Sequence, residues 1–195
     1  MTATTATPVL AADLRGTWAR DAALVSGGAL FIAASAQIAI PLPFTPVPLT
    51  AQTLAVLLTG AALGSSLGLA SSALYFALAL VGLPVLAPTA EGTHIAGSAV
   101  LAMPSLGYVV GFLAASFAVG LLAERGFTQT PLRTALAMVV GNIVIYAVGV
   151  VWLQHALGAT WSDAIAWGAT PFFIGDAIKV GVAAALLPTA WKLIR

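Results

Sequence analysis

The stretch FFIGDAIKVGVAAALLPTA, residues 172–190, is long and apolar enough to cross a membrane as a single helix. Its only charged residues are Asp176 and Lys179, which lie three positions apart. Charged side chains are costly to place inside a bilayer, and those found there usually mark a binding site or a transport pathway. Residues three apart share one face of a helix, so both side chains can reach the same cavity. The stretch therefore predicts a membrane fold and the place of its functional site.

The composition of the whole chain extends this prediction to all 195 residues. Hydrophobic residues make up 61% of the chain and charged residues 7%, whereas about a quarter of the residues of soluble domains are charged. We therefore expect an all-α integral membrane protein that forms a single membrane domain over residues 1–195. The net charge of +1 gives no basic surface that would favour nucleic acid.

The chain contains no cysteine and only two histidines, neither of which lies beside an acidic cluster. Thiolate nucleophiles and thiolate metal sites are thereby excluded, and we expect no metal site and no cofactor. The sequence also lacks a nucleotide-binding loop, a nucleophile elbow and a zinc-binding helix. We therefore expect a protein that is not an enzyme. If it moves a substrate uphill, the energy comes from an ion gradient or from a separate protein.

Apolar runs predict six transmembrane helices. We interpret the first run as a retained helix instead of a cleaved signal, because it continues past Ala34-Ser35-Ala36 to the length of a membrane span. The weakest boundary lies between the second and third runs, at Gly64-Ser65-Ser66. The six runs are residues 22–40, 49–63, 67–81, 104–123, 134–154 and 170–190.

Six spans place both termini on the same side of the membrane, and the basic residues indicate which side. The three loops on the opposite side, residues 41–48, 82–103 and 155–169, contain no Lys or Arg. Positive residues favour the cytoplasm, so we expect cytoplasmic termini in a multi-pass protein of the plasma membrane. This divides the chain into a cytoplasmic segment 1–20, a six-helix bundle 21–190 and a tail 191–195. The basic residues on the terminus side are Arg15, Arg20, Arg125, Arg133, Lys192 and Arg195.

Two of the outward loops have unusual compositions. Residues 41–48 contain four prolines, which favour a stiff, extended segment that is either a simple connector or a wall or lid over a site. Residues 82–103 are long for a connection between helices. Their apolar content predicts a segment that folds back over the ends of the helices.

The charged pair has two compatible interpretations. One is an internal ion pair that joins helices, and the other is a binding site. Both hold if a ligand replaces the partner that each side chain has inside the protein. Other polar side chains in the predicted spans need partners in lipid and should face inward, where each makes a hydrogen bond between helices or contacts a ligand. Those that we consider candidate ligand contacts are Gln52, Tyr108, Asn142 and Tyr146.

Several segments together resemble one known family across residues 22–190. They are QIAIPLPFTPVPLTAQT at 37–53, Tyr75 with GLPV at 82–85, GYVVGF at 107–112, Gly141-Asn142, and PFFIGDAIK at 171–179. The Pro-rich segment and the Gly-Asp-x-x-Lys pattern are specific in combination. The chain thus resembles the BioY family, the biotin-specific S components of energy-coupling factor (ECF) vitamin transporters.

This resemblance implies a six-helix subunit that captures biotin from the extracytoplasmic side and associates with a transmembrane coupling protein and ATPase subunits. It places Asp176 and Lys179 on the biotin head group, whose ureido N–H groups suit a carboxylate and whose carbonyl suits an ammonium. It also implies a role for Tyr108 at the site, and contact of Ala29 and Ala33 with the coupling protein. An ion-gradient-coupled carrier of another small metabolite is the alternative.

The chain departs from the family pattern just before Tyr108. Residues 103–108 read MPSLGY, where many members read GPTGGY. The long outward loop also lacks a Lys or Arg to pair with the carboxylate of biotin. The sequence therefore assigns the head group of the ligand and leaves its acid end unassigned.

Overall fold

The computed structural model describes residues 9–11 and 16–194, and most of these residues are helical. Two short 3-10 helices, η2 (Gly97–Ala102) and η3 (Thr170–Phe172), and one two-stranded antiparallel ladder of β1 (Ala39–Ile40) with β2 (Leu49–Thr50) complete the described fold. The α-helices are α1 (Trp18–Ala36), α2 (Gln52–Leu63), α3 (Ser65–Leu80), α4 (Leu106–Glu124), α5 (Pro131–Leu157), α6 (Trp161–Gly168) and α7 (Phe173–Ile194).

Three segments of the described chain are long and apolar enough to cross a membrane: Leu106–Glu124, Pro131–Leu157 and Trp161–Leu193. Helices α2 and α3 are apolar but shorter. Helix α1 carries Arg20 and Asp21 in its first turns. The prediction of a mainly helical fold that contains apolar segments long enough to cross a membrane is confirmed.

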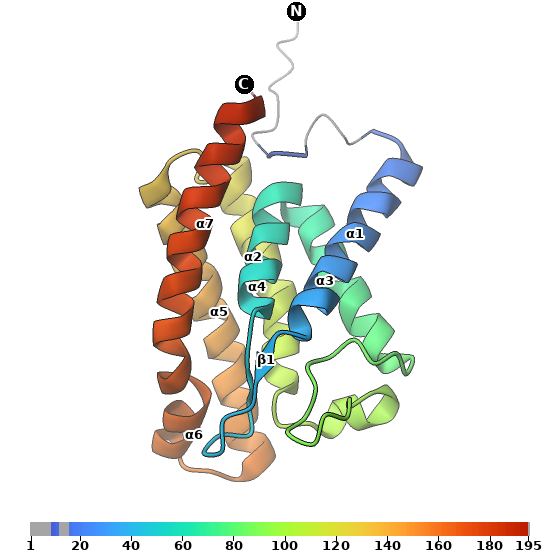
Figure 1. Cartoon of the computed structure of the whole chain (residues 1–195), viewed down its shortest axis with the longest axis vertical. Coiled ribbons are helices and arrows are strands. Elements are labelled where there is room, and N and C mark those ends of the chain that lie inside the picture. The colour runs from blue at the N-terminus through green and yellow to red at the C-terminus, as the bar shows by residue number, and fades with distance from the viewer. Residues whose placement is uncertain (1–8, 12–15, 195) are drawn as a thin grey trace, which may run out of the picture.

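The helices form a bundle whose two ends differ (Figure 1). The start of α1, the connection from α4 to α5 and the end of α7 lie at one end. The β1–β2 ladder, residues 82–103 and α6 lie at the other, which we call the loop end. Of the basic residues counted above, Arg15 and Arg195 lie outside the described residues.

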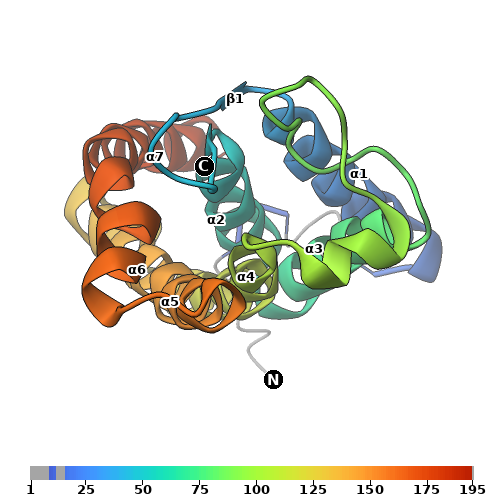
Figure 2. The same cartoon turned by 90° about the horizontal axis from the view of Figure 1, so that it is seen from below.

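A view from the loop end (Figure 2) shows α2, α4, α5 and α7 around a common centre. Helix α7 contacts α5 and α2, and α4 joins α5 to α2. Helix α3 packs on α2 and α4, and α1 packs on α3. The centre of the bundle at its loop end is therefore surrounded by helices distant in sequence, and this is where the charged pair lies.

Small residues let α2, α3 and α4 approach closely. A Cβ added to Gly60 on α2 would lie 3.0 Å from Cα of Ser116 on α4, and one added to Gly68 on α3 would lie 2.7 Å from Cα of Gly60. The hydroxyls of Ser72 and Ser116 are joined across the α3–α4 contact at 3.0 Å. These small residues thus serve contacts inside the bundle, as is common between membrane helices.

The structure places Ala29 and Ala33 in the same kind of contact. Ala29 is fully buried and Ala33 is 9% exposed, and both belong to the core of the bundle. In this chain both side chains are thus packed against the bundle, and their contact with a coupling protein stays a prediction. The exposed side of α1 instead carries large and small apolar residues, among them Leu30 and Phe31.

Local capping explains where the observed helices depart from the predicted runs. Helix α1 begins at Trp18 because the Thr17 hydroxyl accepts a hydrogen bond from the Arg20 N–H at 3.4 Å. The predicted loop 155–169 contains helix α6, which was not predicted and which starts after Thr160. The Thr160 hydroxyl accepts a hydrogen bond from the Asp163 N–H at 3.2 Å and donates one to the Asp163 carboxylate at 2.7 Å. Prediction from apolar runs missed α6 because it is short and includes polar residues.

The break between α2 and α3 is a single residue, Gly64, with a φ of 85° that favours glycine. Glu124, at the end of α4, accepts hydrogen bonds from the N–H and the hydroxyl of Ser65, at 2.8 and 2.9 Å. The chain therefore ends α2 and starts α3 at this point, and α3 packs back along α2. The predicted location of this boundary is confirmed.

Candidate functional site

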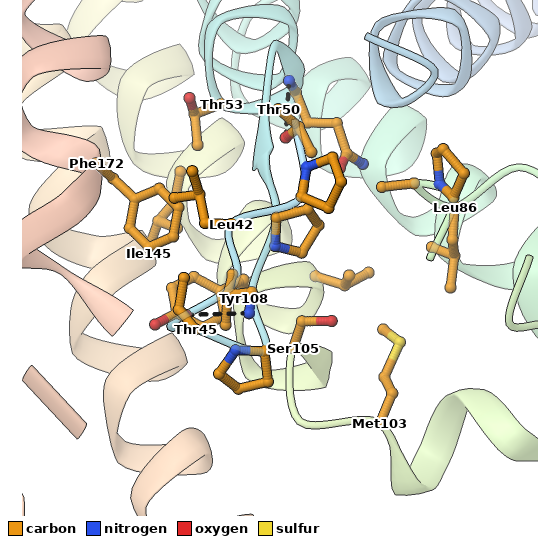
Figure 3. A pocket seen from close by; sticks show the side chains of 18 of the residues that line it. Leu42, Thr45, Thr50, Thr53, Leu86, Met103, Ser105, Tyr108, Ile145 and Phe172 are labelled. Atoms are coloured by element: carbon orange, nitrogen blue, oxygen red, sulfur yellow. Dashed lines mark hydrogen bonds between the residues drawn. The ribbon is translucent and has the colours of Figure 1, made fainter. Parts of the chain in front are cut away.

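A cavity of about 250 Å³ lies at the loop end, between α2, α4, α5, α7 and the two long loops. In Figure 3, Ile145 and Phe172 lie on one side of it and Leu86 and Met103 on the other. The volume is slightly below the usual range of roughly 300–1,000 Å³ for small-molecule sites. Most of the lining is apolar, and its polar residues are Thr45, Thr50, Gln52, Thr53, Thr89, Ser105, Tyr108, Tyr146, Asp176 and Lys179.

Asp176 is held in the cavity wall by hydrogen bonds from three helices. It is the fourth residue of α7, where the helix dipole favours a negative charge. Its Oδ1 accepts from the Thr53 hydroxyl at 3.1 Å and from Lys179 Nζ at 2.8 Å, and its Oδ2 accepts from the Tyr146 hydroxyl. The Asp176 side chain is 7% exposed, so these bonds replace water around a nearly buried carboxylate.

Lys179 lies one helical turn further along α7 and forms an ion pair with Asp176. Its Nζ also donates to the Thr53 hydroxyl at 2.7 Å. The Lys179 side chain is 17% exposed, more than that of Asp176. The pair therefore presents one acceptor group and one donor group, side by side, to the same space, and the prediction that the two charges share one cavity is confirmed.

Thr53 is a site residue that sequence reasoning missed. It belongs to the first turn of α2 and joins that helix to both charges of α7. Threonine is common in membrane helices, where it often bonds to its own backbone, so its type alone did not identify it. Its position next to Gln52, at the end of the segment 37–53 that resembles the BioY family, could have identified it as a site residue.

The structure brings Gln52, Tyr108 and Tyr146 to the cavity, as predicted. The Gln52 amide nitrogen donates to the Tyr75 hydroxyl at 2.6 Å, and the Tyr108 hydroxyl donates to the Gly168 carbonyl at 2.7 Å. The Tyr108 hydroxyl is therefore engaged with the backbone of α6. A Cβ at Gly149 would lie 2.5 Å from that ring, so glycine there makes room for it.

Tyr146 is the closest of these residues to the charged pair. Its hydroxyl donates to Asp176, and its ring meets the ring of Phe173 edge to face, with centroids 5.9 Å apart. This contact fixes the ring between α5 and α7. Tyr146 therefore positions the carboxylate and also forms part of the cavity wall.

Asn142 does not line this cavity. It lies one turn from Tyr146 on α5, but its side chain borders a separate hollow of about 10 Å³, together with Thr53 and Lys179. Asn142 and Tyr146 are four residues apart on α5 and share one helical face, yet they line different spaces. Asn142 and Lys179 line the same small hollow.

The Pro-rich segment 41–48 forms a wall of the cavity, with Pro41, Pro46 and Pro48 in the lining. The Thr45 hydroxyl donates to the Trp167 carbonyl on α6 at 2.7 Å and accepts from the Val47 N–H at 3.2 Å (Figure 3). Of the two possibilities left open by the sequence, a connector or a wall, the structure supports the wall.

Residues 86–95 form the facing wall as a small hairpin. The Thr89 N–H donates to the Thr93 carbonyl at 2.7 Å, and His94 Nδ1 lies 2.8 Å from the Leu86 carbonyl oxygen. Hydrogen bonding to the Thr89 side chain, and then to the backbone, lowers the pKa of the exposed Glu91. The buried Leu86 and Val100 confirm that the long loop folds back over the helix ends.

Comparison with known proteins is consistent with this geometry. A family model describing the BioY family matches residues 3–195. The chain belongs to the BioY family. Two relatives named Biotin transporter BioY are those of Rhizobium etli, 35% identical over 81% of this chain and 85% of theirs, and of Rhodobacter capsulatus, 39% identical over 79% and 83%.

A solved crystal structure shares the fold. It is the structure at 2.1 Å of the S-component for biotin from an ECF-type ABC transporter. It superposes with a TM-score of 0.78 and 26% sequence identity, over 91% of this chain and 95% of that one. The arrangement of helices described above is therefore that of an S-component for biotin.

Proposed function

We propose that this chain is the biotin-capturing S component of an ECF-type vitamin uptake transporter. The observation that carries the proposal is the Asp176–Lys179 pair, with an Nζ to Oδ1 distance of 2.8 Å, in the wall of a small, mainly apolar cavity. The family membership and the names of the relatives support biotin as the ligand.

The ureido ring of biotin complements this pair. Its N–H groups donate to the Asp176 carboxylate, and its carbonyl accepts from Lys179 Nζ. In the structure the two side chains bond to each other and to Thr53. A ligand that supplies both a donor and an acceptor can replace the bond between the two side chains by one bond to each of them. Such an exchange avoids leaving either charge unpaired in the bundle.

The other predicted residues have supporting roles in this proposal. Tyr146 holds the carboxylate, Gln52 and the ring of Tyr108 form the wall around the head group, and the acyl chain lies along the apolar lining near Leu86 and Met103. The proposal includes no catalytic step and no metal or cofactor.

We further propose that α1, α2, α3, α4, α5 and α7 cross the plasma membrane and that both termini are cytoplasmic. Support comes from the position of the start of α1 and the end of α7 at the same end of the bundle (Figure 1). Arg20, Arg125 and Lys192 lie in segments at that end, which is the distribution expected for a cytoplasmic face. The cavity at the loop end then receives biotin from outside, and an energy-coupling module of a transmembrane protein and ATPases completes the transporter.

Calorimetric titration of biotin into the detergent-solubilised protein tests the proposal. Desthiobiotin keeps the ureido group and should compete with biotin, whereas lipoate keeps an acyl tail without a ureido group and should not. Absence of biotin binding, or equal competition by lipoate, would contradict the proposal. Uptake that follows an ion gradient without ATPase partners would favour the carrier alternative.

A further inference from the structure

The Gln52 amide and the Tyr75 hydroxyl form a pair that joins the cavity wall on α2 to the interior of α3. Tyr75 is fully buried and is not part of the cavity lining, whereas Gln52 is 6% exposed and lines the cavity. The two polar groups lie 2.6 Å apart. The oxygen and the nitrogen of an amide have equivalent positions, so a half-turn of its last bond exchanges which of them faces the hydroxyl.

Two observations favour the amide oxygen on the side of Tyr75. A tyrosine hydroxyl carries a proton that needs an acceptor when it is buried. Among residues 9–11 and 16–194, Gln52 is the one partner of this hydroxyl, so an amide nitrogen there would leave the proton without an acceptor. The distance of 2.6 Å is also closer to the usual O–H···O length of about 2.7–2.8 Å than to the N–H···O length of about 2.9–3.0 Å.

The other atom of the Gln52 amide is open to the cavity. It makes no hydrogen bond within the described part of the chain, and it is not one of the partnerless atoms there that are closed to water, which are Asp21 Oδ1 and Asn142 Oδ1. Since Gln52 lines the cavity, this atom is accessible from that space. In the orientation favoured by the Tyr75 hydroxyl it is the amide nitrogen, which has two N–H donors.

We propose that Tyr75 is a positioning residue that turns the Gln52 amide so that it donates an N–H to the ligand. This role rests on the proposed function. Gln52 directly precedes Thr53, whose hydroxyl bonds to both Asp176 and Lys179, which places the first turn of α2 beside the ligand head group. The ureido carbonyl has two lone pairs, of which Lys179 takes one and Gln52 the other. The site thereby selects a head group that carries an oxygen acceptor.

Comparison of biotin with iminobiotin, in which a nitrogen that carries hydrogen replaces the ureido oxygen, tests the donor role of Gln52. We expect Gln52→Met to lower the ratio of the dissociation constants, iminobiotin over biotin, by about two- to tenfold, the contribution of one hydrogen bond between uncharged groups. Both ligands are titrated into the same variant, so general damage to the cavity cancels in the ratio. A higher ratio would mean that Gln52 presents its oxygen, and an unchanged ratio that it does not face the carbonyl; either result would overturn the proposal.

Gln154→Met is the matched control for this comparison. The Gln154 amide nitrogen donates to the Ala159 carbonyl at 3.0 Å, and the residue is not part of the cavity lining. The control should keep the ratio within about twofold of that of the unmodified protein.

A double-mutant cycle separates positioning by Tyr75 from its contribution to packing. Tyr75→Phe keeps the ring and removes the hydroxyl, and we expect biotin to bind about two- to tenfold more weakly because the amide is no longer held. In a Gln52→Met background the same change should alter the affinity by less than about twofold. It should also raise the melting temperature there, because it removes a buried hydroxyl without a partner. Equal losses of affinity in both backgrounds would refute the positioning role.

Raman spectroscopy of the ligand-free protein decides the orientation without a binding measurement, and it applies if iminobiotin binds too weakly to measure. The intensity ratio of the tyrosine ring doublet differs between a hydroxyl that donates a strong hydrogen bond and one that only accepts. Subtraction of the Tyr75→Phe spectrum removes the signals of Tyr108 and Tyr146. We expect the donor signature for Tyr75, and an acceptor signature would overturn the proposal. If the unmodified protein binds no biotin, the proposed function fails, while this signature still decides which amide atom faces Tyr75.

Discussion

Replacement of Asp176 by asparagine is the most direct test of the site. The change keeps the size of the side chain but removes the charge and one acceptor oxygen. Asp176 accepts hydrogen bonds from Thr53, Lys179 and Tyr146, and an amide nitrogen in place of Oδ1 or Oδ2 would face one of these donors. The ureido N–H groups would meet a neutral amide in place of a carboxylate.

The structure gives the size of the expected effect. A hydrogen bond to a charged group contributes about 1.5–3 kcal/mol, which corresponds to a loss of about 10- to 150-fold in biotin affinity. Breaking a fully buried ion pair costs about 3–5 kcal/mol of folding stability. Because the Lys179 side chain is 17% exposed and borders a cavity, water can solvate the ammonium, and we expect a smaller loss of about 1–3 kcal/mol.

Calorimetric titration gives the affinity, and thermal unfolding in the same detergent gives the stability. Asp163→Asn is the matched control, because Asp163 is a carboxylate on α6 that bonds to Thr160 and lies outside the cavity lining. The control should bind biotin as the unmodified protein does. If Asp176→Asn binds biotin within about threefold of the unmodified protein while remaining folded, the role of the carboxylate in ligand recognition is refuted.

Three further predictions follow from the same geometry. Thr53→Val keeps the shape of the side chain but removes the hydroxyl between Lys179 and Asp176, and titration should show a loss of about tenfold in biotin affinity; an unchanged affinity would contradict the bridging role. The primary amide of biotin should bind within about threefold of biotin in a calorimetric titration. Among the described residues, 9–11 and 16–194, Lys179 is the one cation in the cavity lining, and in our proposal it binds the head group, so the acid end has no cationic partner. A loss of affinity above about 30-fold would reveal such a partner. Gly60→Ala should lower the free energy of unfolding by about 1–3 kcal/mol, measured by chemical denaturation, because the new methyl group meets the backbone of α4 at Ser116, whereas Gly27→Ala meets open space and should not be destabilising.

The class of the protein and the location of its charged pair could be predicted from the sequence alone. Long apolar runs are recognised by length and hydropathy, which are local properties. Asp176 and Lys179 are conspicuous because charge is rare in such runs. Their shared face follows from the period of the helix.

The tertiary structure decided which residues surround that pair. Thr53 lies 123 positions before Asp176 in the sequence, yet its hydroxyl bonds to that carboxylate. Asn142 and Tyr146 share one helical face, but Tyr146 borders the cavity and Asn142 borders a separate hollow, which Lys179 also lines. Ala29 and Ala33 have the spacing of an interface, and packing of α1 on the bundle buries them. Apolar patterns fix which residues avoid water, whereas the partners of each side chain depend on how the helices pack, and many packings are compatible with the same pattern.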